Sequence, residues 1–162
     1  MNADLERELA LDEAIDLAKA ARNEPAANSP KRLLVFEDDL YCAKLLRSHL
    51  TRAWPDCEII LASNKKELVA ALEQNRYDLI LSDYLVPDFS GLAALSLVRK
   101  QLPEIPFIFV SGSIGDDVGV ECLKLGATDY VLKNRLPQLV PAIQRALDEA
   151  EKKYERKLVA AR

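Results

Sequence analysis

The chain contains 162 residues, of which 49% are apolar and 30% are charged, and its formal net charge is −4. This length accommodates one domain with extensions and excludes a second full domain, and the composition is typical of a folded globular protein. The mild negative charge, without a basic stripe, disfavours direct binding to nucleic acid or to an anionic membrane surface.

The first thirty residues are distinct from the rest of the chain. Residues 3–22 are rich in alanine, leucine and glutamate, which predicts a helix, and residues 23–30, NEPAANSP, have the composition of a linker. We therefore expect an N-terminal helix and linker at 1–30, a main domain at 31–150 and a C-terminal helical extension at 151–162.

The main domain alternates short apolar runs with helical patterns. Strands are expected at 32–37, 57–62, 77–83, 106–112 and 128–133. Helices are expected at 40–53, 64–75, 91–102 and 117–126, followed by a long last helix that starts at 138–141. The nearly continuous apolar runs are typical of parallel strands covered on both faces. Strands that alternate with helices predict right-handed crossovers and a doubly wound α/β sheet.

Polar residues end four of the expected strands. Glu37 and Asp38 follow the first strand, Asp83 ends the third, Ser111 ends the fourth and Lys133 ends the fifth. In an open α/β sheet, ligands bind beyond the carboxyl ends of the strands. The sequence therefore predicts three acids, a hydroxyl and an ammonium at one edge of the sheet.

These residue types point to one kind of chemistry. Three carboxylates with no nearby histidine or cysteine cluster form an oxygen site that suits a hard cation such as Mg²⁺. A lysine that faces such a metal has a phosphoryl oxygen as its natural target. Metal, lysine and hydroxyl together would neutralise a phosphoryl group on one carboxylate. Asp39, next to the acidic pair, is interpreted as a cap of the following helix.

With these motifs the chain resembles the CheY-like receiver domain of two-component response regulators, over roughly residues 31–150. VFEDD resembles the acidic pair after the first strand, and LILSDYLVPDFSG resembles the phosphoacceptor loop. FIFVSG resembles the segment with the switch hydroxyl, and GATDYVLK the segment with the aromatic and the lysine. The resemblance implies a flavodoxin-like, five-stranded parallel sheet of order 2-1-3-4-5.

The resemblance also implies an acceptor and a metal site. Asp83 would be the phosphoacceptor, and Asp38 and Asp83 would bind Mg²⁺. Glu37 would act through a metal-bound water, and the backbone carbonyl of Leu85 would complete the protein ligands.

The remaining site residues are carried over in the same way. Ser111 and Lys133 would contact the phosphoryl group, and Tyr130 would be the switch aromatic. Asn134 departs from the family pattern, which usually has a proline after the lysine, so a trans bond is expected there. Gly119 weakens the helix expected at 117–126, which should therefore be short or mobile.

The partners implied by the resemblance are proteins. The phosphoryl donor would be a histidine kinase or a histidine phosphotransfer protein. The output would be a change in protein contacts at the face formed by the helix at 117–126, the strand at 128–133 and the last helix. No nucleic acid and no membrane is expected to bind.

Three rival functions remain to be weighed. A haloacid-dehalogenase-type phosphohydrolase needs a second aspartate two residues after Asp83, where this chain has Leu85. A flavin mononucleotide carrier needs a hydroxyl- and glycine-rich loop after the first strand, where EDDLYC has the wrong charge. The alternative that stays open is a pseudo-receiver, which is never phosphorylated and acts only through protein contacts.

The last helix carries a pattern of its own. Apolar residues recur at alternating three- and four-residue steps, the spacing of a coiled-coil seam, at Val140, Ile143, Leu147, Ala150 and Tyr154. We expect homodimerisation through this helix. Its apolar stripe could instead be covered by the N-terminal helix or by a following domain, or the extension could be solvated.

The cellular compartment is inferred from two further observations. The chain does not begin with a secretory signal, and no segment is long enough to span a membrane. Three widely spaced cysteines, Cys42, Cys57 and Cys122, are expected to be reduced core thiols. A cytoplasmic protein is therefore expected.

Overall fold

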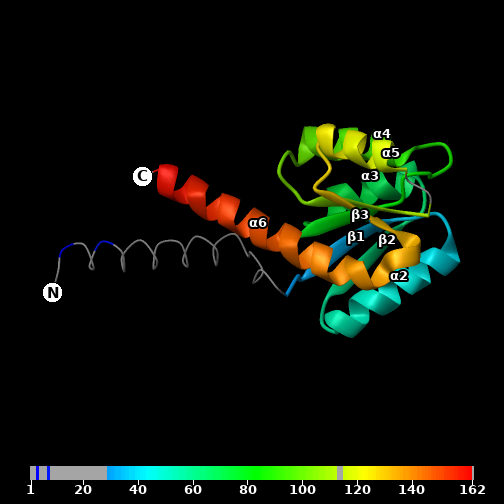
Figure 1. Cartoon of the computed structure of the whole chain (residues 1–162), viewed down its shortest axis with the longest axis horizontal. Helices are drawn as coiled ribbons and strands as arrows, with labels where there is room; N and C mark the ends of the chain where they lie inside the picture. Colours follow the sequence, from blue (N-terminus) through cyan, green and yellow to red (C-terminus); the bar gives the residue numbers. More distant parts are fainter. Residues whose placement is uncertain (1–2, 4–6, 8–28, 113–114, 162) are drawn as a thin grey trace.

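A five-stranded parallel sheet forms the centre of the domain, and helices cover both of its faces (Figure 1). The computed structural model describes residues 3, 7, 29–112 and 115–161. The strands are β1 (Arg32–Phe36), β2 (Glu58–Ala62), β3 (Leu79–Ser82), β4 (Phe107–Ser111) and β5 (Asp129–Leu132). All neighbouring pairs are parallel, in the order β2-β1-β3-β4-β5. The doubly wound sheet and its strand order are therefore confirmed.

Helices follow the strands as expected. They are α2 (Leu40–Ala53), α3 (Lys65–Gln74), α4 (Gly91–Gln101), α5 (Asp116–Lys124), the 3-10 helix η1 (Lys133–Gln138) and α6 (Leu139–Ala160). The long last helix begins at Leu139, within the predicted range. The expected N-terminal helix at 3–22 lies, apart from residues 3 and 7, outside the described residues.

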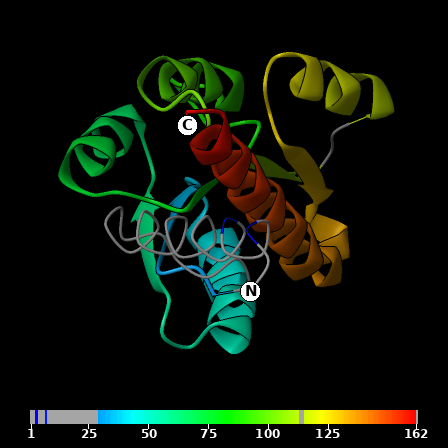
Figure 2. The same ribbon diagram turned by 90° about the vertical axis from the view of Figure 1, so that its left-hand side faces the viewer.

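The two faces of the sheet are covered by different helices. In Figure 2, α3, α4 and α5, coloured green to yellow, lie on one side of the sheet, and α2 in cyan and α6 in orange to red lie on the other. Successive residues of a strand point to opposite faces. In β1, Leu33 and Val35 therefore pack toward α2 and α6, while Leu34 and Phe36 pack toward α3 and α4. This explains why the strand is apolar at every position.

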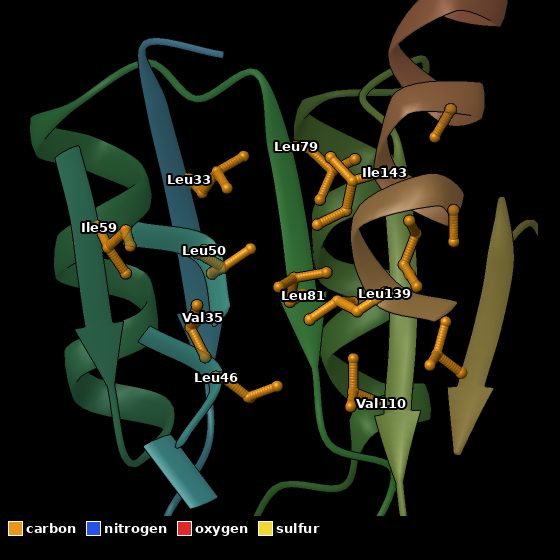
Figure 3. Packing of buried hydrophobic residues seen from close by; sticks show 14 of the residues in the cluster. Leu33, Val35, Leu46, Leu50, Ile59, Leu79, Leu81, Val110, Leu139 and Ile143 are labelled. Carbon is orange, nitrogen blue, oxygen red and sulfur yellow. The ribbon is translucent and has the colours of Figure 1, made fainter. Parts of the chain in front are cut away.

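The core on the α2 and α6 side joins both helices to the central strands. Figure 3 labels ten of its residues: Leu33, Val35, Leu46, Leu50, Ile59, Leu79, Leu81, Val110, Leu139 and Ile143. Leu139 and Ile143 of α6 are fully buried against the sheet. The first turns of α6 are therefore part of the domain core rather than a free extension.

The helix ends differ in how well they are capped. Asp39 caps α2, as predicted, because its carboxylate accepts a hydrogen bond of 3.0 Å from the backbone N–H of Cys42. Asn64 and Ser90 cap α3 and α4 in the same way. Helix α5 has only nine residues and begins after Gly115 without a side-chain cap, so it is short, as expected.

The distal part of α6 extends beyond the body of the domain (Figure 1). Ile143 and Leu147 of the predicted seam are buried in the domain, so they are not available to a partner. Lys157 forms an ion pair with Glu104 in the loop between α4 and β4. Val140 is partly buried against the same core, so Ala150 and Tyr154 are the seam residues that lie beyond it.

The described residues also bear on compartment and membrane. Cys42, Cys57 and Cys122 are free thiols, but only Cys122 is buried in the core. Cys57, just before β2, is partly buried and packs against the core, whereas Cys42, at the start of α2, is partly exposed, so the expectation of three core thiols is wrong for Cys42. Among the helices in the described part of the chain, none is both long and apolar enough to cross a membrane.

Candidate functional site

Two acidic residues continue neighbouring strands at their carboxyl ends. The backbone N–H of Glu37 donates to the carbonyl of Ala62, and that of Asp83 donates to the carbonyl of Phe36, each at 2.9 Å. Both residues thus extend the hydrogen bonding of the sheet by one position beyond β1 and β3. Because β1 and β3 are adjacent, the two carboxylates are brought to the same edge.

A cluster of three carboxylates forms at this edge. Ligand oxygens of Glu37, Asp38 and Asp83 all lie within 4.8 Å of one another. Glu37 is only 3% exposed, and its Oε2 atom is buried without a hydrogen-bond partner. An orphaned buried oxygen beside two further carboxylates suits a hard cation such as Mg²⁺. These three side chains could therefore hold such a cation.

Lys133 crosses to this cluster from the end of β5. Its Nζ donates a hydrogen bond to Oε1 of Glu37 and lies 3.3 Å from Oδ2 of Asp83. Burial alone would lower the pKa of Lys133, but the hydrogen bond and negative charge of Glu37, together with the charge of Asp83, outweigh burial and raise the pKa. The side chain therefore remains an ammonium ion between the two carboxylates.

The surroundings of Glu37 raise the pKa of its carboxyl group. Burial raises its pKa to about 7; the neighbouring Asp83 carboxylate adds to this rise, while Lys133 opposes it. At neutral pH the carboxyl is therefore only partly ionised in the absence of a cation. A bound cation would favour the ionised form, so metal binding and proton release are linked at this residue.

The loop after Asp83 requires a glycine at one position. A Cβ atom on Gly91 would lie 2.3 Å from the carbonyl oxygen of Asp83 and 2.9 Å from Cα of Tyr84. The Gly91 N–H also donates to the carbonyl of Tyr84 at 3.0 Å. The first residue of α4 thus presses against the backbone of Asp83, and only glycine allows this approach.

The same loop is anchored by an aromatic side chain. The ring of Phe89 packs edge-on against Phe36 at 6.3 Å between centroids, and the ammonium of Lys65 lies 5.1 Å from the Phe89 centroid.

The backbone nitrogen of Leu85 lies 3.4 Å from Oδ1 of Asp83. The role of the Leu85 carbonyl as a metal ligand stays a prediction.

Ser111 and Tyr130 share one face of the sheet. Phe109 pairs with Tyr130 across β4 and β5, and Ser111 pairs with Leu132. Paired residues in a parallel sheet point to the same face, as do residues two positions apart along a strand. The hydroxyl and the ring therefore both lie on the face that α5 covers. Ser111 is 2% exposed and Tyr130 is half-buried.

The segment after Lys133 has the expected peptide geometry. No cis peptide bond occurs in the described chain, so the bond between Lys133 and Asn134 is trans.

Three exposed apolar residues lie within three positions of the clustered acids in the chain. We call them the apolar rim: Leu40, Tyr41 and Leu85, which are 72%, 74% and 63% exposed. They are the most exposed large apolar side chains in the described part of the chain. Leu40 and Tyr41 form the first turn of α2, and Leu85 follows Asp83 by two residues. This rim was not predicted from the sequence, although apolar residues directly after a run of acids were a usable signal.

Comparisons with known proteins agree with this geometry. The family model for the response regulator receiver domain matches residues 33–144. The regulatory protein LuxO of Vibrio cholerae is 30% identical over 99 residues, which cover 61% of this chain and 21% of LuxO. The chain thus spans about a fifth of the length of such curated relatives.

Solved structures are similar over most of the domain. A CheY-like receiver domain protein from Methanospirillum hungatei superposes with a TM-score of 0.68 at 29% identity, covering 77% of this chain and 99% of that one. The phosphorylated cyanobacterial phytochrome response regulator RcpA gives a TM-score of 0.61 at 26% identity, covering 71% of this chain and 89% of that one.

Proposed function

This chain belongs to the response regulator receiver family, and we propose that it accepts a phosphoryl group on Asp83 in a Mg²⁺-dependent reaction. Receiver domains are signalling domains rather than classical enzymes. The observation that carries the proposal is the position of Lys133, whose ammonium lies between Glu37 and Asp83 at the acidic edge of the sheet. The phosphorylated state of the similar RcpA structure supports the same chemistry.

The proposed step is a displacement at phosphorus. A carboxylate oxygen of Asp83 forms a bond to the phosphorus of a phosphohistidine, while the phosphorus–nitrogen bond breaks and its electron pair returns to the imidazole. Mg²⁺, when bound, would supply positive charge that offsets the charge on the transferred group. Asp38 and Asp83 would hold the cation directly, with the Leu85 carbonyl, and Glu37 would act through a water.

Lys133 and Ser111 complete the proposed reaction site. The raised pKa of Lys133 keeps its ammonium charged, so it can exchange its contact with Asp83 for one with a phosphoryl oxygen. The Ser111 hydroxyl, at the end of β4, would donate a hydrogen bond to another phosphoryl oxygen. The product would be an aspartyl phosphate neutralised by lysine, hydroxyl and cation.

The donor is proposed to be a histidine kinase or a histidine phosphotransfer protein. Such a donor must cover the carboxylate cluster during transfer, and the apolar rim of Leu40, Tyr41 and Leu85 is the surface that it would bury. Tyr41→Ala should slow transfer from a phosphohistidine donor protein that loads the wild-type chain, while loading from acetyl phosphate stays unchanged. Leu102→Ala, at the far end of α4, is the matched control.

The proposed output is a change of protein contacts at α5, β5 and α6. We also propose that the chain forms homodimers through the distal part of α6 and works in the cytoplasm, which its free thiols would suit. We propose that the domain itself does not bind nucleic acid. LuxO is named a regulatory protein, but this chain covers only 21% of it, so activities of the remainder are not carried over.

Intact mass is the direct test. The wild-type chain should gain one phosphoryl group with acetyl phosphate and Mg²⁺, and EDTA should prevent the gain. Asp83→Asn should abolish it, whereas Asp88→Asn, an exposed position in the same loop, should retain it. If neither acetyl phosphate nor a phosphohistidine protein loads the wild-type chain, the protein is a pseudo-receiver that acts by protein contact alone.

A further inference from the structure

The ring of Tyr130 lies directly against the backbone of α5 at Gly119. A Cβ atom placed on Gly119 would lie 2.6 Å from Cζ of the ring, 2.7 Å from Cε1 and 3.0 Å from Cε2. Real Cβ atoms do not approach an aromatic ring this closely, because such separations are well inside van der Waals contact. Residue 119 can therefore carry no side chain unless the ring or the helix moves.

Helix α5 has few other means of being held in place. It has nine residues, and its N-cap, Gly115, provides no side-chain hydrogen bond. The glycine at 119 disfavours the helical state relative to alanine. Among the described side chains of this helix, Cys122 is fully buried and Val118 packs partly buried against the core, whereas Val120 and Leu123 are exposed. The contact between the ring and Gly119 therefore acts together with Cys122 and Val118 in positioning α5 on the sheet.

We propose that Gly119 is a positioning residue that couples the orientation of Tyr130 to the position of α5. While the ring rests on Gly119, α5 stays at the distance from β5 seen here. When the ring turns away, it leaves a space against the helix backbone, and α5 shifts to fill that space. The exposed side chains Val120 and Leu123 move with the helix, so a partner protein can read the change.

The signalling part of this inference rests on the proposed function. Ser111 and Tyr130 lie on the same face of the sheet, the face covered by α5. In the switch that the receiver resemblance implies, a phosphoryl group on Asp83 would draw Ser111 toward it and free space on this face; what is added here is that the ring would leave Gly119 when it occupies that space. The mechanical part, the contact between ring and helix, stands without phosphorylation.

A double-mutant cycle tests the mechanical part. Its readout is whether the change in Tm caused by Gly119→Ala reverses its sign when Tyr130 is also replaced. Glycine to alanine inside a helix ordinarily stabilises a protein. Gly119→Ala should instead lower the Tm, because the new methyl group meets the ring of Tyr130. In a Tyr130→Ala background the same substitution should raise the Tm. Equal effects of Gly119→Ala in both backgrounds would overturn the coupling.

Tyr130 ring signals in NMR spectra give a second readout that does not depend on stability. Gly119→Ala should shift them. Gly115→Ala is the control, since it makes the same change at the N-cap of the same helix, where a Cβ meets nothing within 4 Å. Ring signals that stay unchanged in Gly119→Ala, or that shift equally in Gly115→Ala, would overturn the proposal.

The signalling part is tested at a fixed concentration of acetyl phosphate. Coupling is reciprocal, so a substitution that displaces the ring should raise the fraction of chain phosphorylated on Asp83. If the ring is displaced but the phosphorylated fraction of the variant is equal to or below that of wild type, the link to phosphorylation is overturned. If the wild-type chain gains no phosphoryl mass at all, the proposed function fails, whereas the cycle between residues 119 and 130 still decides the mechanical part.

Discussion

The ammonium of Lys133 donates a hydrogen bond to the buried carboxylate of Glu37, although the two residues are 96 positions apart in the chain. This pair joins the two ends of the domain, since Glu37 follows the first strand and Lys133 follows the last. It also holds together the edge of the sheet where the proposed chemistry takes place.

We expect Lys133→Met to destabilise the metal-free protein more at pH 8 than at pH 6. The folded-state pKa of Glu37, about 7, lies above its ordinary value of 4.5. The stability that protonated Glu37 contributes is therefore present below pH 4.5 and is lost as the pH rises through 7. Without Lys133 the pKa should rise further, so the additional loss appears at the higher pH, where it should be about 1–3 kcal/mol.

Urea unfolding in EDTA at both pH values would check this prediction. Lys44→Met, which removes an exposed lysine from α2, is the control and should show little dependence on pH. An equal loss of stability at pH 6 and pH 8 for Lys133→Met would contradict the coupling with Glu37.

Mg²⁺ should raise the thermal stability of the wild-type chain. At a free concentration of ten times the Kd, binding to the folded state alone contributes about 1.4 kcal/mol. Asp38→Ala should remove this response and, by relieving repulsion in the cluster, leave the metal-free protein at least as stable as wild type. Asp39→Ala should keep the response, because Asp39 caps α2 instead. Thermal unfolding with and without Mg²⁺ would measure the metal-dependent increase in Tm and the stability of the metal-free proteins. An increase in Tm with Mg²⁺ that survives in Asp38→Ala would remove Asp38 from the ligands.

Gly91→Ala should destabilise the protein by about 1–3 kcal/mol, as expected for overpacking. The added methyl group would overlap the carbonyl oxygen of Asp83, so loading with acetyl phosphate should also slow down. Gly112→Ala is the control, since the nearest heavy atom to a Cβ there is 4.0 Å away, on Lys133. Chemical denaturation would decide, and equal effects of the two substitutions would show that the loop yields to the methyl group.

Removal of residues 150–162 should convert a dimer to a monomer. The shortened chain keeps Leu139, Ile143 and Leu147, which are buried in the core, so the domain should stay folded. It loses Ala150 and Tyr154, the part of the seam that lies beyond them. Light scattering at tens of micromolar, with and without phosphorylation, is the measurement. A full chain that is monomeric in both states would rule out dimerisation through α6.

The fold was predictable because its signal is local. Apolar runs such as 33–36 and 107–110 reveal strands buried on both faces, and the alternation with helices determines the topology. The edge of the sheet then groups Glu37, Asp83 and Lys133 without any knowledge of side-chain contacts.

What could not be predicted depends on distances between elements that are far apart in the sequence. Lys133 was expected to face a phosphoryl group, and its bond to Glu37 depends on how far β5 lies from β1. Gly119 was interpreted as a weak point of its helix, because a helical propensity does not reveal the Tyr130 ring that occupies the place of its side chain. The close approach of Gly91 to the backbone of Asp83 could not be predicted for the same reason.

The spread of the site along the chain has a consequence during synthesis. At about 5–20 residues per second, a ribosome needs roughly 5–20 s to proceed from Glu37 to Lys133. Throughout that interval the acids have no lysine beside them, and the sheet still lacks the cover that Leu139 and Ile143 later provide. If the proposed function holds, a chain that has not yet reached Lys133 would therefore offer a kinase no working acceptor. Phosphorylation would then be confined to chains in which β5 and the first turns of α6 have joined the sheet.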